Sequence, residues 1–197
     1  EIEWLLFVLN ESFYKTIKIS KVDINKINKF KNNFDHSYAK KIKSIEKKIN
    51  HDVKAVEYFI IDHFKKNNLK KFIPYVHLGL TSEDVNSLAY ALMIREIKDE
   101  TIVSINTLNK ELKSLATKYK KISFLARTHG QPASPSTLGK EILVFHKRLE
   151  RQTDQLKTIK PMAKWGGATG NYHTILLANK NKDPVKIATK FIRKFKV

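Results

Sequence analysis

The stretch between Gly79 and Gly130 contains neither glycine nor proline, the two residues that most often interrupt a helix. Its apolar residues recur three and four positions apart, as along one face of an α-helix: Val85, Leu88 and Leu92, then Leu108, Leu112, Leu115 and Tyr119. We therefore predict one helix from about Thr81 to about Lys120, about 60 Å long at the usual rise per residue. A helix of this length is typical of a long helical bundle rather than of a small globular domain.

A second apolar stripe predicts another long helix, from about Ser136 to Ile159, which Pro161 ends. We expect it to pack nearly antiparallel to the first, because a short connection joins the two. Shorter helical patterns lie upstream, to about Tyr14 and again between residues 42 and 60 with a break near Asn50, and no strand-rich region is evident. The sequence therefore predicts an all-α fold, with an N-terminal helical domain over residues 1–80 and the first part of a long-helix bundle over residues 81–197.

Both ends of the chain read as cut within helices, which predicts a fragment of a longer protein. The chain begins at Glu1 rather than at a methionine, and it ends in ATKFIRKFKV, where apolar residues recur every four positions. The apolar run Trp4–Leu9 is too short to span a bilayer, and acidic residues flank it. We therefore expect neither a membrane segment nor a signal peptide in this sequence.

The net charge of +19 could mark a nucleic-acid-binding protein. The lysines, however, are scattered and often stand beside asparagine, as in DINKINKFKNNF, and they form no compact stripe interleaved with aromatic residues. This pattern favours a solvated lysine-rich surface, with nucleic-acid binding as the alternative. The chain has no cysteine, which excludes disulfides, zinc–thiolate sites and cysteine nucleophiles.

Three polar stretches interrupt the helical pattern: NHDVKAVEYF at Asn50–Phe59, HLGLTSEDVN at His77–Asn86 and RTHGQPASPS at Arg127–Ser136. In the first, His51 stands beside Asp52, a pair that by itself usually makes a plain polar contact. In the second, the apolar neighbours of His77 favour a histidine of the core.

The start of the long helix allows two interpretations. Thr81 or Ser82 fits its N-cap, and Thr81 with Asp84 resembles a capping box with aspartate in place of the usual glutamate. The same two hydroxyls, beside the free N–H groups of a helix N-terminus, also suit a bound carboxylate or phosphate. Taken alone, this segment favours the plain cap.

The third polar stretch combines a histidine with residues that stiffen the chain. Gln131 and Ser134 precede prolines, which favours extended backbone, and Gly130 permits a sharp turn. Ser134 fits the N-cap and Pro135 the first position of the following helix. We therefore expect a stiff loop that holds His129 at the end of the helix bundle, where an imidazole can give or take a proton near neutral pH.

No cofactor motif competes with this histidine. The sequence has no G-x-G-x-x-G and no G-x-x-x-x-G-K-[ST], and no pair among its seven histidines has the spacing of a zinc motif. We expect neither a metal nor an organic cofactor.

In their order along the chain, NHDVKAVEYF, TSEDVNSLAYALM and ARTHGQPASPSTLGKE resemble the adenylosuccinate lyase family of the fumarase/aspartase superfamily, and GGATGNYH resembles that family's glycine-rich segment G-A-x-G-N-Y. The resemblance runs from near Glu1 to at least His173. It implies a β-elimination that cleaves adenylosuccinate to AMP and fumarate, and the succinylated aminoimidazole carboxamide ribotide to its amide and fumarate, without a cofactor. It also implies a cytoplasmic homotetramer in which each active site combines residues from three subunits.

The resemblance assigns proton-transfer roles to two histidines. His129 matches the family's general acid, which protonates the departing nitrogen. His51 matches a second active-site histidine in the family's His-Asp motif. Asn50 and Asp52 beside it match substrate contacts.

The resemblance also assigns residues that hold the substrate. Thr81 and Ser82 match the hydroxyl pair that binds its anionic end, which reverses the preference for a plain cap. Thr128 and Gln131 are expected to line the pocket beside the acid.

The sequence departs from the family pattern where the general base should stand. The signature loop S-S-x-M-P-x-K-x-N, which carries the family's base serine, is absent, as is an N-terminal Arg-Tyr pair that holds the phosphate. We therefore expect this chain to be inactive by itself.

Within the superfamily, the alternative is argininosuccinate lyase. The motifs RTHGQPA and NHDVKAVE argue against it. Outside the superfamily, the alternative is a non-catalytic basic helical module that binds nucleic acid or a protein partner.

Overall fold

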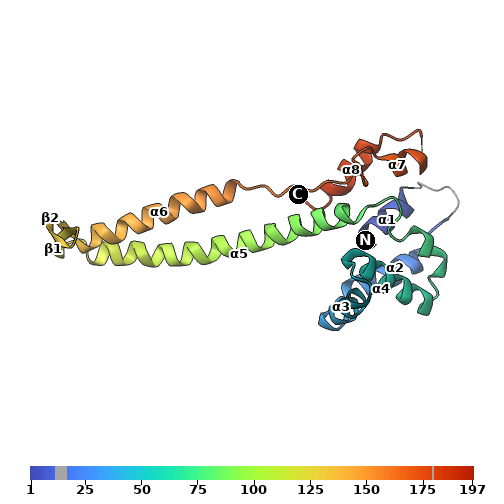
Figure 1. The fold of residues 1–197 in the computed structure, drawn as a ribbon, viewed down its shortest axis with the longest axis horizontal. Helices are drawn as coiled ribbons and strands as arrows, with labels where there is room; N and C mark the ends of the chain where they lie inside the picture. Colours follow the sequence, from blue (N-terminus) through green and yellow to red (C-terminus); the bar gives the residue numbers. More distant parts are fainter. Residues whose placement is uncertain (12–16, 179) are drawn as a thin grey trace. The chain divides into compact units, whose positions relative to one another are not determined.

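The computed structural model describes residues 1–11, 17–178 and 180–197 and is predominantly helical, which confirms the all-α class (Figure 1). Its α-helices are α1 (Ile2–Asn10), α2 (Lys21–Asn32), α3 (His36–Ile49), α4 (Asp52–Lys66), α5 (Ser82–Lys118), α6 (Leu138–Thr158), α7 (His173–Ala178) and α8 (Pro184–Arg193). A 3₁₀ helix, η1 (Lys70–Tyr75), follows α4, and two strands, β1 (Ser123–Thr128) and β2 (Gln131–Thr137), separate α5 from α6. Among the described residues, no helix combines the length and the apolar character needed to cross a membrane.

The predicted helices agree closely with the observed ones. The single helix expected from Thr81 to Lys120 is α5, and the second long helix is α6, which begins two residues later than expected. The expected break near Asn50 is the junction of α3 and α4, where Asn50 takes a left-handed conformation with φ of 52°. The N-terminal helix ends at Asn10, and the rest of its predicted extent to Tyr14 lies in residues 12–16, outside the described residues.

The described chain divides into two compact units, residues 1–91 with 162–197, and residues 92–161. Helix α5 begins in the first unit and continues in the second. The predicted domain boundary between residues 80 and 81 concerns the family architecture and stays a prediction.

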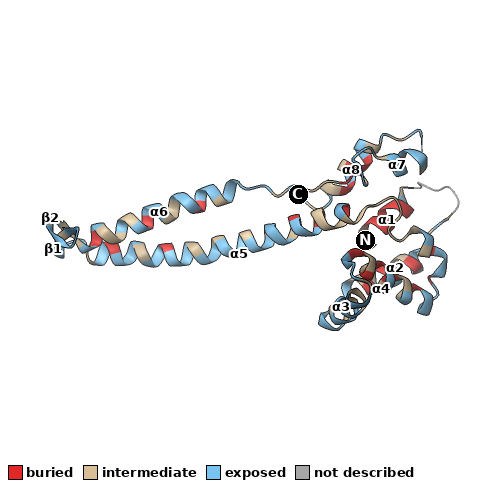
Figure 2. Cartoon of the chain, viewed as in Figure 1, coloured by how far each residue is buried: buried red, intermediate tan, exposed pale blue. Residues whose placement is uncertain are grey.

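The core of the first unit is formed by one face each of α1, α2, α4 and η1 (Figure 2). Its fully buried members include Leu5, Ile27, Phe64 and Phe72. Helix α2 starts at Ser20, whose side chain accepts the N–H of Asp23, so this helix has an ordinary N-cap. Each buried aliphatic or aromatic side chain of this kind stabilises the fold by about 1.5–3 kcal/mol.

An aromatic cluster joins the C-terminal part of the first unit to its start. The ring centroid of Phe191 in α8 lies 4.5 Å from that of Trp165 and 5.0 Å from that of Trp4 in α1. The indole N–H of Trp4 donates to the backbone oxygen of Leu78, 2.8 Å away. These contacts place the segment before α5 and the segment after α6 around the same helix, α1.

The second unit consists of α5 from residue 92 onward and α6, which run antiparallel, with the strands that connect them (Figure 1). Near the connection, Gly139 lies against the backbone of Ala116. Further along, Nδ1 of the buried His146 lies 2.8 Å from Oδ1 of Asn109. At the far end, Nζ of Lys98 donates to the backbone oxygen of Ile159 at 3.1 Å. The predicted antiparallel packing is thus confirmed over the length of α6.

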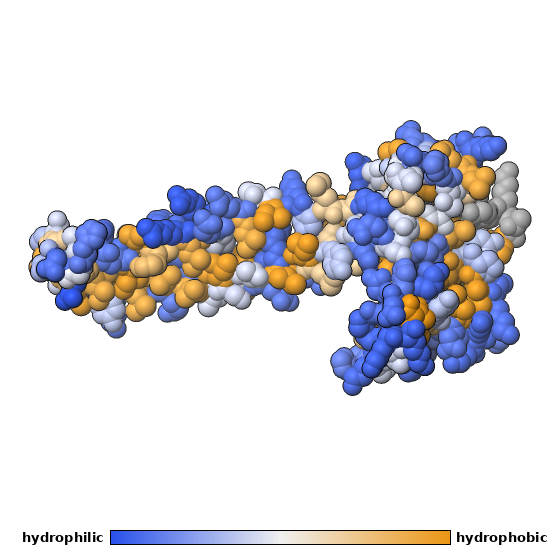
Figure 3. Space-filling model, viewed as in Figure 1, coloured by the Kyte–Doolittle hydropathy of each residue, from blue (hydrophilic) through white to orange (hydrophobic). Residues whose placement is uncertain are grey.

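Helix α5 exposes many large apolar side chains, most of them outside the stripe that the sequence predicts. Its exposed large apolar side chains are Tyr90, Met93, Ile94, Ile97, Val103, Leu108 and Leu115. Ile97 and Val103 are the most exposed, at 63% and 65%. Apolar atoms run along the visible side of this helix in Figure 3. An exposed apolar surface of this kind usually marks an association site.

Candidate active site

His51 is the N-cap of α4. Its backbone is extended, with φ of −148° and ψ of 117°, and its Nδ1 accepts the N–H of Lys54 at 3.2 Å. Because Nδ1 uses its lone pair in this bond, the neutral ring carries its proton on Nε2. The side chain is 47% exposed. His51 therefore offers an Nε2–H donor to a ligand while its other nitrogen fixes the ring to the helix.

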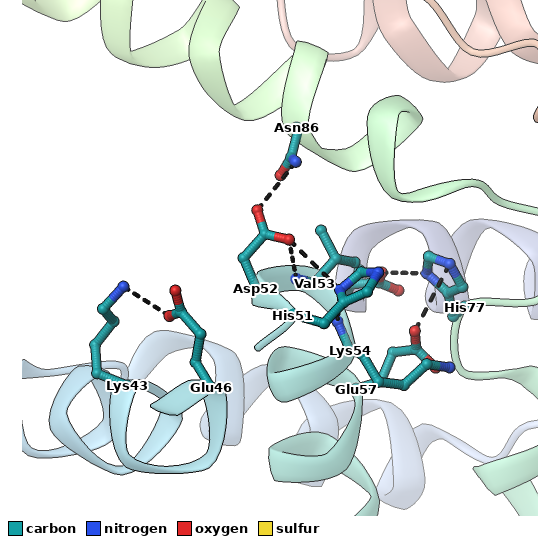
Figure 4. Close-up of polar contacts among 10 residues, drawn as sticks. Lys43, Glu46, His51, Asp52, Val53, Lys54, Glu57, His77 and Asn86 are labelled. Carbon is teal, nitrogen blue, oxygen red and sulfur yellow. Dashed lines mark hydrogen bonds and ion pairs between the residues drawn. The ribbon is translucent and has the colours of Figure 1, made fainter. Parts of the chain in front are cut away.

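Asp52 connects the start of α4 to the start of α5 (Figure 4). Its Oδ1 accepts the N–H of Val53 at 2.7 Å, and its Oδ2 accepts the side-chain amide of Asn86 at 3.1 Å. The hydrogen bond from the Val53 N–H, helped by the one from the Asn86 amide, outweighs burial and lowers the pKa of the Asp52 carboxyl below its ordinary value. Asp52 is therefore an ionised acceptor at neutral pH, at the junction where Asn50 ends α3.

His77 is largely buried, as its apolar neighbours predict, but it lies between two carboxylates, which they do not predict (Figure 4). Its Nδ1 is 2.6 Å from Oε1 of Glu1, and its Nε2 is 3.7 Å from Oε1 of Glu57. The other oxygen of Glu57, Oε2, accepts a hydrogen bond from Nζ of Lys54 at 2.8 Å. Burial lowers the pKa of His77, but the hydrogen bond to Glu1 and the charges of both glutamates outweigh it, so the pKa is raised. The apolar neighbours in sequence could not reveal these two partners.

The segment Thr81–Ser82 forms the start of α5, and Asp84 supplies its cap. The carboxylate of Asp84 accepts the N–H of Thr81 at 2.9 Å, and the N–H of Asp84 donates to the backbone oxygen of Thr81 at 3.0 Å. Within the part of the chain that the structure describes, the hydroxyls of Thr81 and Ser82 make no hydrogen bond, and both residues are partly exposed. The acid thus performs the capping, which leaves both hydroxyls available to a ligand.

Asp84 makes more contacts than its position as a capping residue predicts. It is fully buried, and it also accepts the N–H groups of Gly166 at 3.0 Å and Gly167 at 3.1 Å. Nζ of Lys164 lies 3.0 Å from the same carboxylate. The only sequence signal for these contacts is an acid at the third position after a cap and a glycine-rich segment far along the chain. Nothing in the sequence pairs the two.

His129 lies at the tip of the β1–β2 hairpin. Thr128 pairs with Gln131, which leaves His129 and Gly130 as the two turn residues, with φ of 50° and 76°. Positive φ at both central positions is the signature of a type I′ turn, the preferred connection of a two-residue hairpin. Histidine is among the residues that tolerate this left-handed region better than most. Thr128, His129 and Gln131 are all exposed.

The expected stiff loop around His129 is therefore a hairpin, and the expected start of the following helix is wrong. Pro135 lies within β2 opposite Leu125 and not in the first turn of α6. The N-cap is Thr137 and not Ser134, because the side chain of Thr137 accepts the N–H of Lys140 at 3.2 Å. Strand pairing keeps the backbone extended up to Thr137, so the helix begins only after it.

The predicted site residues fall into two groups. Asn50, His51, Asp52, Thr81 and Ser82 belong to the first unit, where the bond between Asp52 and Asn86 brings the α3–α4 junction to the start of α5. Thr128, His129 and Gln131 belong to the second unit. Among the described residues, no group of three or more histidine and carboxylate side chains has the arrangement of a metal site. In the first group, His51, Thr81 and Ser82 offer donors that suit an anionic ligand and Asp52 is an acceptor, whereas the second group offers an exposed imidazole.

Comparison with known proteins places these features in a family context. A family model described as Lyase matches residues 9–191. The adenylosuccinate lyase of Buchnera aphidicola subsp. Schizaphis graminum is 41% identical over 181 residues, which are 90% of this chain and 40% of the relative. That of Escherichia coli is 36% identical over 195 residues, or 98% of this chain and 43% of the relative. The chain thus spans about 40% of the length of the curated relatives it matches.

Solved structures share the fold at low sequence identity. A fumarate lyase from Mesorhizobium sp. BNC1 superposes with a TM-score of 0.80 at 18% identity, and the match covers 100% of this chain and 43% of the other. A 3-carboxy-cis,cis-muconate lactonizing enzyme from Pseudomonas putida gives a TM-score of 0.72 at 21% identity, covering 98% of this chain and 43% of the other. At these identities the likeness concerns the fold alone.

Proposed function

Because the chain belongs to the lyase family whose model it matches over residues 9–191, we propose that the protein of which it forms part is an adenylosuccinate lyase. The observation that carries this proposal is its 36–41% identity to adenylosuccinate lyases over 90–98% of the chain, including the stretches around His51, Thr81 and His129. The proposed reaction cleaves adenylosuccinate to AMP and fumarate, and the succinylated aminoimidazole carboxamide ribotide to its amide and fumarate. Its place in nucleotide synthesis supports a cytoplasmic location.

The reaction is a β-elimination. A base removes the proton from the carbon beside a carboxylate, the carbon–nitrogen bond breaks, and the nitrogen leaves with a proton from an acid. The negative charge that develops on the carboxylate side needs hydrogen-bond donors, which act most strongly when they are fixed in advance. No step requires a metal or an organic cofactor.

In this proposal, His129 donates the proton to the leaving nitrogen. The exposure of its side chain at a hairpin tip suits a residue that reaches a substrate held by other parts of the assembly. His51 offers its Nε2–H to the substrate, and Asn50 and Asp52 are substrate contacts beside it. Thr128 and Gln131 line the pocket on either side of the acid in the hairpin register.

Thr81 and Ser82 bind the anionic end of the substrate in this proposal. Two observations support their role: their hydroxyls are unengaged within the described chain, and the N-terminus of α5 carries a partial positive charge. Because the capping is done by Asp84, binding a ligand costs the helix no hydrogen bond.

The active enzyme is proposed to be a homotetramer. The exposed apolar side chains of α5 support association, since a surface of this kind is rarely left in water. The sequence lacks the loop S-S-x-M-P-x-K-x-N that carries the base serine in the family. We therefore expect turnover only from the complete, assembled enzyme and not from these residues alone.

Replacement of His129 in the full-length enzyme tests the catalytic assignment. Release of fumarate and AMP from adenylosuccinate should fall at least about 100-fold in His129→Asn, within the usual range for loss of a general acid. Asparagine is chosen because it tolerates the left-handed turn conformation and so keeps the hairpin. Thr81→Ala should instead weaken substrate binding at least as much as turnover.

The control for these variants is His36→Gln, which replaces an exposed histidine at the start of α3. It should match the wild type in turnover and assembly. Near-normal turnover of His129→Asn in the intact tetramer would refute the role of His129. Tight binding of duplex DNA at physiological salt, with no release of fumarate, would favour the alternative of a basic nucleic-acid-binding module, which the charge of +19 keeps open.

A further inference from the structure

The carboxylate of Asp84 joins two segments that lie more than 80 positions apart in the sequence. Its Oδ2 accepts the N–H groups of Thr81 at 2.9 Å and Gly167 at 3.1 Å. Its Oδ1 accepts the N–H of Gly166 at 3.0 Å and lies 3.0 Å from Nζ of Lys164. Asp84 is fully buried, so it cannot touch a ligand. Both of its oxygens are occupied by donors from the chain itself.

A second set of bonds reinforces this connection one turn further along α5. The hydroxyl of Ser87 donates to the backbone oxygen of Lys164 and accepts the N–H of the same residue, both at 3.2 Å. Nζ of Lys164 also donates to the backbone oxygen of Gly167 at 2.8 Å. The first two turns of α5 are therefore fastened to residues 164–167 at both Asp84 and Ser87.

The glycine-rich segment that makes these bonds, residues 164–172, has a fixed backbone conformation of its own. The N–H of Tyr172 donates to the backbone oxygen of Gly166 at 3.0 Å, which closes the segment into a loop. Gly167 and Gly170 have φ of 77° and 75°, a region that other residues rarely adopt. A side chain on Gly166 would come within 3.1 Å of the backbone of Gly170. The loop is thus a compact support against which the start of α5 rests.

We propose that Asp84 is a positioning residue of the active site, which sets the placement of the Thr81 and Ser82 hydroxyls by fixing the first turn of α5 to the glycine-rich loop. This inference rests on the proposed function, in which those hydroxyls bind the anionic end of the substrate. Asp84 acts through Thr81, whose N–H it accepts directly. A small displacement of groups that hold a substrate can reduce activity by up to about 100-fold, so such an anchor matters for binding.

Asparagine cannot replace Asp84 in this role. A carboxylate presents acceptors on both sides, whereas an amide presents one acceptor and one N–H₂ donor. If the N–H₂ group took the place of Oδ1, it would face the backbone N–H of Gly166. If it took the place of Oδ2, it would face the N–H groups of Thr81 and Gly167. The ion pair with Lys164 would also be lost. Asp84→Asn therefore loosens the loop without changing the size of the side chain.

The test compares Asp84→Asn, Ser87→Ala and Glu83→Gln in the full-length enzyme. Asp84→Asn should raise KM for adenylosuccinate about tenfold or more, with the pH profile of kcat unchanged, because Asp84 transfers no proton. Hydrogen exchange at Gly166 and Gly167 should become faster. Ser87→Ala should shift KM in the same direction by less. Glu83→Gln, which removes an exposed carboxylate next to Asp84, should match the wild type in both measurements.

A merely structural role predicts a different result. It would lower the fraction of active enzyme, so kcat would fall in both variants while KM stayed at the wild-type value, and that outcome would overturn the inference. If Asp84→Asn does not fold, Ser87→Ala decides in the same way, since its replacement buries no unpaired charge. Wild-type enzyme that released no fumarate would refute the proposed function itself, whereas an active wild type with an unaffected Asp84→Asn would refute only the role of Asp84.

Discussion

Gly139 in α6 lies directly against the backbone of Ala116 in α5, and replacing it by alanine should force the two helices apart. A Cβ at this position would lie 2.3 Å from the backbone oxygen of Ala116 and 2.5 Å from the Cα of Lys120. Ordinary van der Waals contact begins near 3.4 Å. The helices would therefore have to separate locally by about 1 Å. No side chain can move to relieve the contact, because both neighbours are backbone atoms.

The expected loss of stability follows from two opposing terms. Overpacking of this kind costs about 1–3 kcal/mol, and the upper end applies because only a backbone shift can relieve it. Alanine favours a helix over glycine by up to about 1 kcal/mol, which offsets part of the loss. The net expectation for Gly139→Ala is a destabilisation of the α5–α6 pair by about 2 kcal/mol. At about 1.4 kcal/mol per factor of ten, this corresponds to a roughly 30-fold larger equilibrium population of the opened pair.

Native-state hydrogen exchange of the full-length protein is the suitable assay, because a large assembly rarely unfolds in a single two-state step. Amides of α5 and α6 near the bond between His146 and Asn109 should exchange faster in Gly139→Ala. Ser114→Ala, at an exposed position of α5, is the matched control and should change stability by less than about 0.5 kcal/mol. If the amides of α5 and α6 exchanged as slowly in Gly139→Ala as in the wild type, the close approach of the two helices at Gly139 would be refuted.

Two further predictions concern charge and association. The pKa of His77 is raised above its ordinary value of 6.5, so its pairing with Glu1 and Glu57 stabilises the fold fully below that pH and ceases to do so as the pH rises through the folded pKa. His77→Gln should flatten this part of the pH dependence of unfolding, and an unchanged curve would contradict the ion pairing. Val103→Lys places a charge among the exposed apolar side chains of α5 and should weaken assembly of the full-length protein in sedimentation experiments. An assembly as tight as that of the wild type would show that Val103 lies outside the subunit contact.

The long helices could be predicted from the sequence because their signal is repeated many times. Along α5, neither glycine nor proline interrupts about ten turns, and apolar residues stand three and four positions apart near both ends, so the predicted ends differ from the observed ones by only one or two residues. The break at Asn50 was predictable for a similar local reason, since asparagine tolerates the left-handed conformation that ends α3.

The hairpin around His129 could not be predicted in the same way. Its strands carry prolines at positions 132 and 135 and are mostly exposed, so they show neither the composition nor the alternation of a half-buried strand. The pairing is instead set by the two turn residues, His129 and Gly130. A histidine–glycine pair between two short extended runs was the one available signal, although it is weaker than the asparagine–glycine pair usually seen in such turns.

The partners of buried charged groups were the other part that the sequence left open. Asp84 was recognisable as a capping residue, because that contact is with a residue three positions away. Its bonds to Gly166 and Gly167 depend on tertiary structure, as do the two glutamates around His77. Sequence periodicity reports which face of a helix is apolar, and it carries no information on which distant donor meets a given carboxylate.

The connection between Asp84 and Gly166 also has a consequence for the order of folding. Residues 92–161 are inserted between the two halves of the first unit, so this contact closes a loop of 82 residues. The α5–α6 pair consists of neighbouring helices and can form early, as local structure generally does. Once Lys98 contacts Ile159, the loop that remains to be closed shortens to about 20 residues. This lowers the entropic free-energy cost of closing it by roughly 1 kcal/mol. During synthesis, the first unit therefore cannot be completed until the α5–α6 pair, and residues 162–197 after it, have left the ribosome.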